Sequence, residues 1–267
     1  MRVLFSLFSS AILFALAGPA AAQGAAPCPA PKALRFQVSQ KIPRAILGFT
    51  QGLEFVGGRL LEGTGALGNG TRLNSIAING QVKQIKDFGT NFFGEGITVL
   101  QGKIYQLSWK EHQVSVYDLK GKLLRRMENQ REGWGLTHDS AQLIFSDGSD
   151  QIFYASTKDF SVSRTVKVRM GARPINNLNE LEYVGGKIYA NVFLTNSILR
   201  IGANSGCVEA QADLSDLLDY MTDAEKAHMN SDVNYVLNGI AFDSTHDVFY
   251  VTGKMWNSIF AGRFVEK

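Results

Sequence analysis

The stretch NFFGEGITVLQGKIYQLSWK, residues 91–110, decides the fold. In it a carboxylate, Glu95, stands between two glycines, directly before an apolar run that is typical of a strand. A glycine turn follows, and then a second apolar run that ends at Trp109. Glycine lets the backbone approach a ligand closely or adopt a positive φ. The pattern predicts a pair of strands that carries a carboxylate beside unusually permissive backbone.

Four other segments have the same layout: a polar or aromatic residue, usually a glycine, an apolar run, a tight turn and a second apolar run. They are FTQGLEFVGGRLLEGTG from Phe49, EGWGLTHDSAQLIFSDGS from Glu132, NLNELEYVGGKIYANVF from Asn177 and VLNGIAFDSTHDVFYVTGK from Val236. Aligned on Gly52, Gly96, Gly135, Glu180 and Gly239, neighbouring segments are 44, 39, 45 and 59 residues apart. Repeats of about 40–50 residues built from short strands are typical of a β-propeller. We therefore predict an all-β, five-bladed β-propeller; a β-sandwich with similar strand and turn signals is the alternative.

The repeat also predicts a site. Equivalent positions of propeller blades lie at equivalent places around the axis. The residues just before the alignment points should therefore ring one mouth of the central channel; they are Gln51, Glu95, Trp134, Asn179 and Asn238. The ends of the second strands form another equivalent set, at Gly65, Trp109, Gly148, Phe193 and Gly253, with Lys254 one residue on. Aromatic walls with a few directed polar groups are typical of a small-molecule pocket.

The rest of the chain has three expected parts. Residues 1–22 have a positive start, an apolar run and a final Ala-Ala-Ala, which is typical of a secretory signal peptide; an uncleaved membrane anchor is the alternative. Residues 23–32 are a Pro/Ala-rich stretch that we expect to be a flexible leader. Residues 33–267 hold the repeats and form one expected domain. The protein should therefore be soluble and periplasmic or secreted, without membrane association once the signal is removed.

Three local patterns refine this picture. The alternating segment 33–41 should pair with residues 257–265 and complete the last blade, which leaves no open edge. The only two cysteines, Cys28 and Cys207, should pair in an exported protein, although two free thiols remain the alternative. Residues 214–229 have helical spacing and predict one short helical insertion before the last blade, with Leu214, Leu217, Leu218 and Met221 on its apolar face.

Composition and spacing exclude several classes of function. The net charge is +3 and no Lys/Arg cluster follows a helix, so we expect no nucleic-acid partner. The four histidines show neither metal-ligand spacing nor a serine-hydrolase order. We expect no metal in the site, no required cofactor and a monomer; a structural cation in the channel is compatible with the fold.

The repeated motifs resemble those of a known family, the plant and bacterial type of glutaminyl-peptide cyclotransferase. The resemblance covers about residues 35–265 and rests on FTQGL, EGTG, FGEGIT, LSWK, EGWGL, SDGS, LNELEY, ANV and NGIAF followed by TGKMW. This family is a five-bladed propeller, and it converts an N-terminal glutamine of a peptide or protein to pyroglutamate with release of ammonia. The chain departs from the family at Phe193-Leu194-Thr195, where the family has Trp-Gln-Thr, and at Gly63, where it has Ser.

Carried over by motif, the resemblance implies a set of site residues. Glu95 would be the proton shuttle and Lys254 would complete the catalytic groups. The substrate-binding residues would be Phe49, Gln51, Phe93, Trp109, Trp134, Asn179 and Phe193.

The residue types suit the reaction. Both reacting groups are in one molecule, so holding the side chain folded back supplies much of the catalysis. One carboxylate can take a proton from the attacking amine and deliver it to the departing nitrogen. Aromatic neighbours should raise the pKa of Glu95 and the Lys254 ammonium should lower it, and the sequence leaves that balance open.

Other functions stay open at this point. A non-catalytic propeller that binds peptide or sugar would have the same aromatic pocket without an essential acid. A calcium-dependent hydrolase propeller would need several Asp or Asn ligands around the channel, whereas the predicted ring offers one Glu and two Asn. Glu95 could also serve only to hold the channel mouth by hydrogen bonds.

Overall fold

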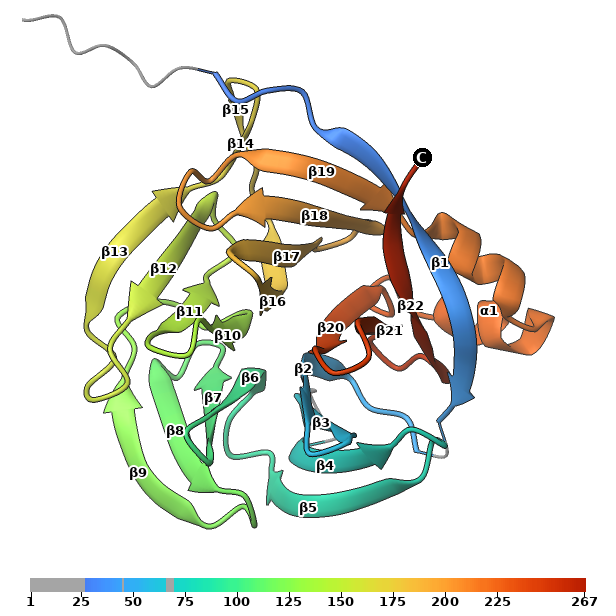
Figure 1. The fold of residues 1–267 in the computed structure, drawn as a ribbon. Coiled ribbons are helices and arrows are strands. Elements are labelled where there is room, and N and C mark those ends of the chain that lie inside the picture. The colour runs from blue at the N-terminus through green and yellow to red at the C-terminus, as the bar shows by residue number, and fades with distance from the viewer. Residues whose placement is uncertain (1–26, 45, 66–69) are drawn as a thin grey trace, which may run out of the picture.

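The structure, a computed structural model, describes residues 27–44, 46–65 and 70–267, and it consists mainly of β-strands arranged around a central axis (Figure 1). The predicted signal peptide and residues 23–26 of the predicted leader lie outside the described residues. The elements in chain order are β1 (Lys32–Pro43), β2 (Thr50–Val56), β3 (Arg59–Thr64), β4 (Thr71–Ala77), β5 (Val82–Gly89), β6 (Gly94–Leu100), β7 (Lys103–Ser108), β8 (Gln113–Asp118), β9 (Leu123–Glu128), β10 (Leu136–His138), β11 (Leu143–Ser146), β12 (Gln151–Ala155), β13 (Val162–Lys167), β14 (Arg169–Met170), β15 (Arg173–Pro174), β16 (Leu178–Val184), β17 (Lys187–Val192), β18 (Ser197–Gly202), β19 (Val208–Asp213), the 3-10 helix η1 (Ser215–Tyr220), α1 (Asp223–Met229), β20 (Leu237–Asp243), β21 (Val248–Gly253) and β22 (Ser258–Glu266).

Within the sheets, strands that follow one another in the sequence pair antiparallel, and β1 is the exception. Three sheets have four strands each, in the orders β2-β3-β4-β5, β6-β7-β8-β9 and β10-β11-β12-β13. A further sheet has eight strands, in the order β16-β17-β18-β19-β1-β22-β21-β20, and β14 and β15 form a small ribbon. Figure 1 shows that β2, β6, β10, β16 and β20 lie nearest the axis. The prediction of an all-β fold is confirmed.

The N-terminal strand β1 joins two groups of strands into the eight-stranded sheet. It runs antiparallel to β22, with Arg35 opposite Val265 and Lys41 opposite Phe260, and parallel to the end of β19. The pairing of residues 33–41 with the C-terminal strand is thus confirmed. A disulfide joins Cys28 to Cys207, as predicted, and so ties the chain just before β1 to the turn before β19.

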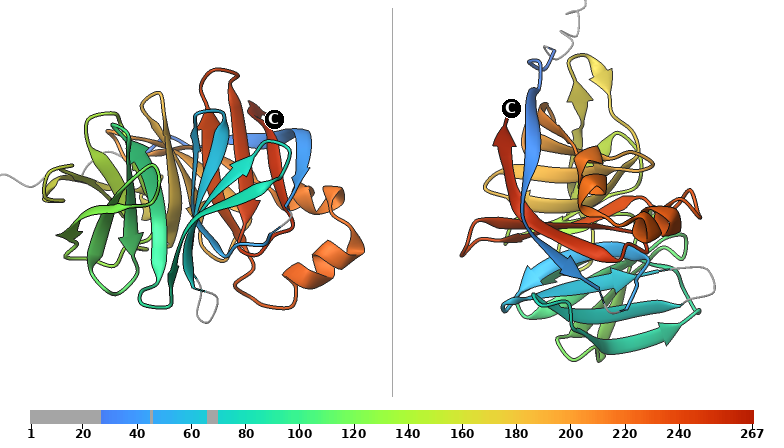
Figure 2. Two further views of the ribbon diagram at one scale, coloured as in Figure 1. Left: turned by 90° about the horizontal axis from the view of Figure 1, so that it is seen from below. Right: turned by 90° about the vertical axis from the view of Figure 1, so that its right-hand side faces the viewer.

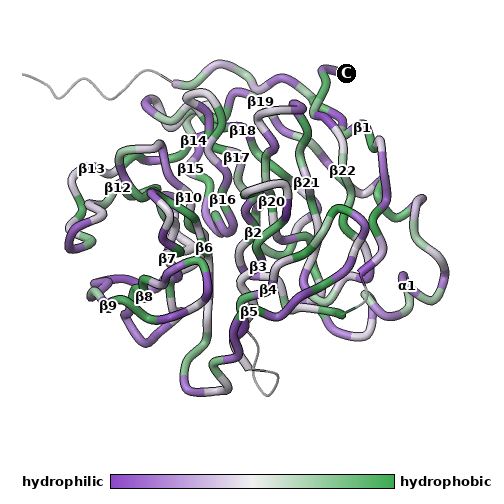
Figure 3. Tube along the Cα trace, turned by 60° about the horizontal axis from the view of Figure 1, so that its bottom comes forward, coloured by the Kyte–Doolittle hydropathy of each residue, from purple (hydrophilic) through white to green (hydrophobic). Residues whose placement is uncertain are grey.

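The burial of a strand depends on how far the strand lies from the central axis. The second strand of each group is buried along nearly its whole length, as in β7 and β17, because neighbouring sheets cover both of its faces. The outer strands β5 and β9 are mostly exposed. Figure 3 shows both hydrophobic and hydrophilic residues along these outer parts of the chain. The side chains of one sheet therefore form the core with those of the next sheet around the axis.

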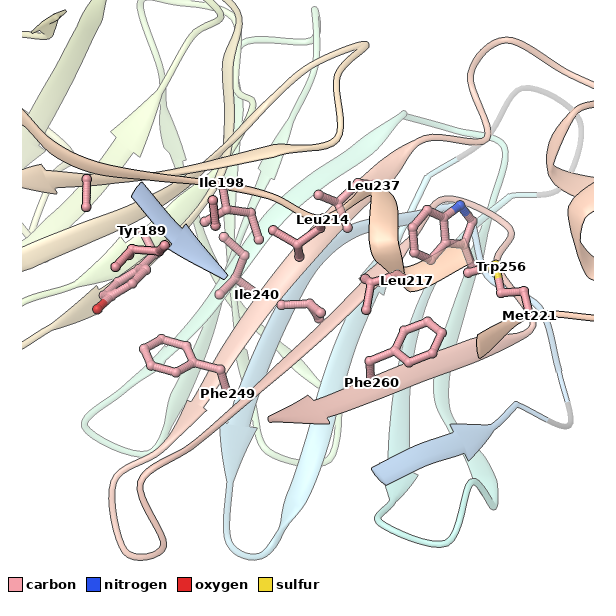
Figure 4. Close-up of a cluster of buried hydrophobic side chains, with 14 residues drawn as sticks. Tyr189, Ile198, Leu214, Leu217, Met221, Leu237, Ile240, Phe249, Trp256 and Phe260 are labelled. Carbon is pink, nitrogen blue, oxygen red and sulfur yellow. The ribbon is translucent and has the colours of Figure 1, made fainter. Parts of the chain in front are cut away.

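Among the described residues, five clusters of buried hydrophobic side chains lie between successive groups of strands. The cluster in Figure 4 joins β17 to β19 with β20 to β22 and includes Tyr189, Ile240 and Phe249. At full burial, large side chains of this kind each stabilise the fold by about 1.5–3 kcal/mol.

The helical insertion before β20 is present but is not one continuous helix. The 3-10 helix η1 ends before Met221, whose backbone is extended, and α1 begins after Thr222. Thr222 and Glu225 form a capping box, in which each side chain accepts the other residue's backbone N–H. This cap starts a new helix, so the predicted helical insertion is confirmed and consists of two short helices. Of the predicted apolar face, Leu214, Leu217 and Met221 are buried against Trp256 and Phe260 (Figure 4). Leu218 is partly buried there too. Figure 2 shows the insertion projecting beside β1 and β22.

Two carboxyls on β16 bond to the main chain of other innermost strands. Glu180 accepts the backbone N–H groups of Leu53 and Ile240, at 3.1 and 2.8 Å. Glu182 accepts the backbone N–H of Phe242 at 2.9 Å. One strand thus bonds to strands on two other sides of the axis, which fixes how the innermost strands sit around the channel.

Candidate active site

A cavity of about 400 Å³ lies where the first strands of the sheets begin and their second strands end. Its walls include all nine residues that the sequence predicted for the site. They are Phe49, Gln51, Phe93, Glu95, Trp109, Trp134, Asn179, Phe193 and Lys254. The repeats bring these residues together from chain positions up to 205 apart, the distance from Phe49 to Lys254.

Glu95 is the buried carboxyl of the cavity, 6% exposed, at the start of β6. Its Oε1 accepts a hydrogen bond from Gln51 Nε2 at 3.2 Å. The Gln51 side chain in turn accepts a long bond from Asn238 Nδ2, at 3.5 Å, and Asn238 also donates to the Thr50 carbonyl. The predicted ring member Asn238 therefore does not line the cavity but supports Gln51 from behind.

The sequence left open whether the pKa of Glu95 is raised or lowered, and burial decides this. Loss of solvent raises the pKa of Glu95 well above its ordinary value, and the Lys254 ammonium offsets only part of this rise. The carboxylates of Glu111 and Glu132 raise the pKa of Glu95 further. A carboxyl tuned in this direction gives up and takes a proton nearer to neutral pH, as a proton shuttle requires.

Lys254 follows β21 and is also buried, 5% exposed. Its Nζ lies 4.7 Å from the ring centre of Phe193 and 5.1 Å from that of Phe49, so the ammonium is held over two aromatic faces. Burial lowers the pKa of Lys254, and the nearby Glu95 carboxylate partly restores it. The cavity therefore contains one buried acid and one buried amine, each influencing the charge of the other.

The side walls are aromatic. Phe93 makes edge contacts with Phe49 and Trp109, at ring-centre distances of 6.4 and 5.6 Å. Trp134 and Phe193 make a similar contact at 5.7 Å. Offset and edge contacts of this kind stabilise ring pairs by about 0.5–1.5 kcal/mol beyond the area they bury. Phe193 contributes a ring to the aromatic wall but has no indole N–H.

The glycines predicted at the ends of the second strands have a different role from lining the cavity. A Cβ on Gly148 would lie 2.7 Å from the Trp134 ring, and one on Gly65 would lie 2.9 Å from the Phe93 ring. Gly253 makes room for Trp256 in the same way. At these three strand ends, glycine thus leaves room for an aromatic ring that packs against the backbone.

Asn179 supplies a polar group that is not used within the protein. It is 2% exposed, and its Oδ1 has no hydrogen-bond partner in the described part of the chain. Buried polar atoms are nearly always paired, so an unpaired amide oxygen on a cavity wall points to a ligand contact.

Three cavity residues were missed by the sequence reasoning: Asp232, Asn234 and Tyr235. They lie between α1 and β20, inside the insertion that interrupts the repeat, so no equivalent position in another repeat marks them. Tyr235 contacts the Phe49 ring at 6.4 Å, and its carbonyl accepts the Trp256 indole N–H. The insertion therefore contributes part of the cavity wall in addition to its packing role.

In the residues that the structure describes, no group of three or more His, Cys, Asp or Glu is placed to hold a metal ion. Over the same residues, no helix combines the length and apolar character needed to cross a bilayer.

Comparison with known proteins places the chain in a family. The profile of the glutamine cyclotransferase family matches residues 10–264. The chain is 31% identical over 227 residues to a glutaminyl-peptide cyclotransferase of Arabidopsis thaliana, covering 84% of this chain and 69% of the plant protein. The crystal structure of a glutaminyl cyclase from Myxococcus xanthus superposes with a TM-score of 0.80 at 28% identity, covering 89% of this chain and 99% of that one. The ring of sheets, the cavity residues and these matches agree, and the chain belongs to the glutamine cyclotransferase family.

Proposed function

We propose that the protein is a glutaminyl-peptide cyclotransferase, an acyl-transfer enzyme that converts the N-terminal glutamine of peptides and proteins to pyroglutamate and releases ammonia. The observation that carries this proposal is the buried Glu95, hydrogen-bonded to Gln51 inside an aromatic cavity that also holds the buried Lys254. Family membership and the matched relatives support the same reaction.

The proposed reaction needs one proton carrier. The neutral α-amine attacks the γ-carbonyl carbon, a new N–C bond forms, and the C–NH₂ bond breaks. Glu95 takes the proton from the attacking nitrogen and delivers it to the departing nitrogen, which leaves as ammonia. Its raised pKa suits both transfers. The cavity walls hold the side chain folded back so that the two reacting groups meet.

An oxyanion develops on the γ-oxygen during the attack. Preorganised donors stabilise such charge by about 2.7–4 kcal/mol per donor in known enzymes. The side-chain amides of Gln51 and Asn179 and the Lys254 ammonium are the candidate donors, because all three line the cavity. This scheme routes no step through a metal or cofactor.

The architecture belongs to the same proposal. We assign five blades, counting the eight-stranded sheet as two blades that β1 joins. The five clusters of buried side chains between successive strand groups support this count. We also propose that residues 1–22 direct export to the periplasm or the medium and that the protein acts as a monomer. Cleavage before Gln23 would give a mature chain whose intact mass lacks residues 1–22, whereas retention of Met1 in periplasmic material would contradict export.

The test of function is ammonia release from a short peptide that begins with glutamine. We expect equal amounts of ammonia and of a product whose N-terminus is blocked. The same peptide with an acetylated N-terminus is the control, because it lacks the attacking amine and should release nothing. Binding of the free peptide without ammonia release would instead identify a non-catalytic peptide-binding propeller.

A further inference from the structure

The aromatic walls of the cavity form two arcs. One arc contains Phe49, Phe93 and Trp109, and the other contains Trp134 and Phe193. Lys254 bridges the arcs on one side, because its ammonium lies over both Phe49 and Phe193. The other end of the first arc is Trp109, and the other end of the second arc is Trp134.

A single carboxylate oxygen bridges those two ends. Glu132 Oε2 accepts the indole N–H of Trp109 at 2.9 Å and that of Trp134 at 3.3 Å. The contacts therefore close into a ring around the cavity, with one cation and one anion joining the two aromatic arcs. Hydrogen bonds to an ionised acceptor are about twice as strong as those between neutral groups.

Backbone packing places Glu132 at this junction. Gly133 donates its N–H to the carbonyls of Ser108 and Trp109, at 3.2 and 3.1 Å. A Cβ on Gly133 would lie only 2.5 Å from the Ser108 oxygen, so glycine is needed for this close approach. The carboxylate is thus fixed next to Trp109 by the main chain on which it stands.

Glu132 is not among the residues that line the cavity, so it reaches a substrate only through the two indoles. We propose that Glu132 is a positioning residue of the site, whose one oxygen fixes both indoles and thereby the wall against which the glutamine side chain folds back. This inference rests on the proposed function, since it concerns the geometry of that reaction.

Glu132 has a second, separable effect, through its charge. The groups that act on Glu95 are Lys254, which lowers its pKa, and Glu111 and Glu132, which raise it; Gln51 donates the hydrogen bond. Glu132→Gln keeps an oxygen that can accept the indoles and removes the charge, whereas Glu132→Ala removes both. Comparing the two variants therefore separates the effect of Glu132 on the positions of the indoles from its effect on the pKa of Glu95.

The first test reads the indoles directly. The chain has three tryptophans, and the third, Trp256, donates its indole N–H to the Tyr235 carbonyl, away from Glu132. In ¹⁵N-labelled protein, Glu132→Ala should shift two indole N–H resonances and leave that of Trp256 in place. Unshifted resonances for Trp109 and Trp134 would overturn the proposal, whatever the activity of the protein.

The second test is kinetic and uses a glutamine-initiated peptide. Glu132→Ala should lower kcat/KM by about tenfold to a hundredfold, as small displacements of positioning groups do. Glu132→Gln should stay within a few-fold of wild type on the plateau of the pH profile. Its acid limb should move to lower pH, because removing a neighbouring negative charge lowers the pKa of Glu95. The matched control is Glu128→Ala, an exposed carboxylate on β9 whose loss should change neither quantity.

The outcomes distinguish the two proposals. Equal losses of kcat/KM in Glu132→Ala and Glu132→Gln would overturn positioning, since charge alone would then explain both. Wild-type kcat/KM in Glu132→Ala would overturn it as well. A wild-type protein that releases no ammonia overturns the proposed function and the role of Glu132 in turnover, whereas the indole resonances still report whether Glu132 holds the two rings.

Discussion

At the scale of single residues, Glu95 and Asp232 are the carboxylates among the described cavity residues, and only Glu95 is buried. Removing a proton from the peptide amine requires a carboxylate that is shielded enough to be basic. Glu95 meets this condition because burial raises its pKa. Asp232 is exposed to solvent and so lacks this shielding.

We therefore predict that Glu95→Gln folds normally, still binds peptide and releases ammonia at least about a hundredfold more slowly, because general acid–base groups contribute on the order of 10²–10⁴-fold. Thermal unfolding, peptide titration and single-turnover ammonia release measure these three properties. The variant should be no less stable than wild type near neutral pH, since an amide avoids the cost of burying a charge. Near-normal turnover of folded protein would end the assignment of Glu95 as proton shuttle.

Lys254→Met provides the complementary prediction. Removing the ammonium takes away the main influence that lowers the pKa of Glu95, so the acid limb of the kcat/KM profile should move to higher pH. Turnover on the plateau should also fall if the ammonium stabilises the oxyanion. A pH profile of ammonia release checks the shift; an acid limb at the wild-type position would contradict the coupling between the two groups.

The sequence could predict the site residues that occupy equivalent positions in the repeats, because such positions converge at one mouth of the central channel. Glu132 was beyond this reasoning, since it stands two residues before the ring position and acts through its neighbours' indoles. For Asn238 the repeat gave a wrong prediction, namely that its side chain lines the channel mouth. It occupies a ring position in the repeat, but it turns behind Gln51 and bonds to the Thr50 carbonyl.

At the scale of elements, the strand β1 and its disulfide are the parts that the sequence predicted best. Alternation over 33–41 predicted the strand, and the expectation of an exported protein predicted the disulfide. The helical insertion was predicted less well. Helical spacing continues through Met221, but the capping box at Thr222 restarts the helix there, and spacing alone does not detect a local cap.

The disulfide leads to a prediction about stability. Cys28 and Cys207 are 179 residues apart, and a link that closes so long a loop restricts the unfolded chain strongly. The double variant Cys28→Ser/Cys207→Ser should lose about 2–4 kcal/mol of unfolding free energy and keep its kcat, because neither cysteine lines the cavity. Denaturant unfolding with parallel kinetics tests this. An unchanged midpoint would mean that β1 needs no tether.

At the scale of the whole molecule, buried carboxyls around the channel make stability depend on pH. Burial raises the pKa of Glu54 to about 7 and the pKa values of Glu180 and Glu182 well above the ordinary value. A carboxyl with a raised folded-state pKa adds stability that is complete below its unfolded pKa and is lost as pH rises through the folded one. Burial lowers the pKa of His138, which acts in the opposite direction near pH 6.

The carboxyls outnumber that histidine, so Tm should fall as pH rises from about 5 to 8. The carboxyl of Glu225, whose pKa is lowered to about 2, does not alter this trend because it is ionised in both states over that range. Glu54→Gln should flatten the dependence, with a gain of up to roughly 3 kcal/mol at pH 8. Calorimetry at several pH values measures both effects. A Tm that climbs steadily to pH 8 would show that these carboxyls are ionised in the fold.

The sequence predicted the ring-like arrangement from its period, but not how the ring is held at its centre. Glu180 stands where the other repeats have glycine, and its carboxyl bonds to the main chain of β2 and β20. A residue that departs from the repeat pattern does not by itself reveal which hydrogen bonds it makes to strands on other sides of the axis. The structure was needed to show that this exception links the blades.

The pairing of β1 with β22 also determines when the eight-stranded sheet can be completed during synthesis. Synthesis runs from the N-terminus, so β1 is made well before its antiparallel partner β22, Ser258–Glu266. The strand β19 is made sooner, and its parallel pairing with β1 does not depend on β22. Every shortened product that stops before β22 keeps one side of β1 unpaired. Pairing with β22 removes that unpaired edge, so the eight-stranded sheet closes only after β22 has been made.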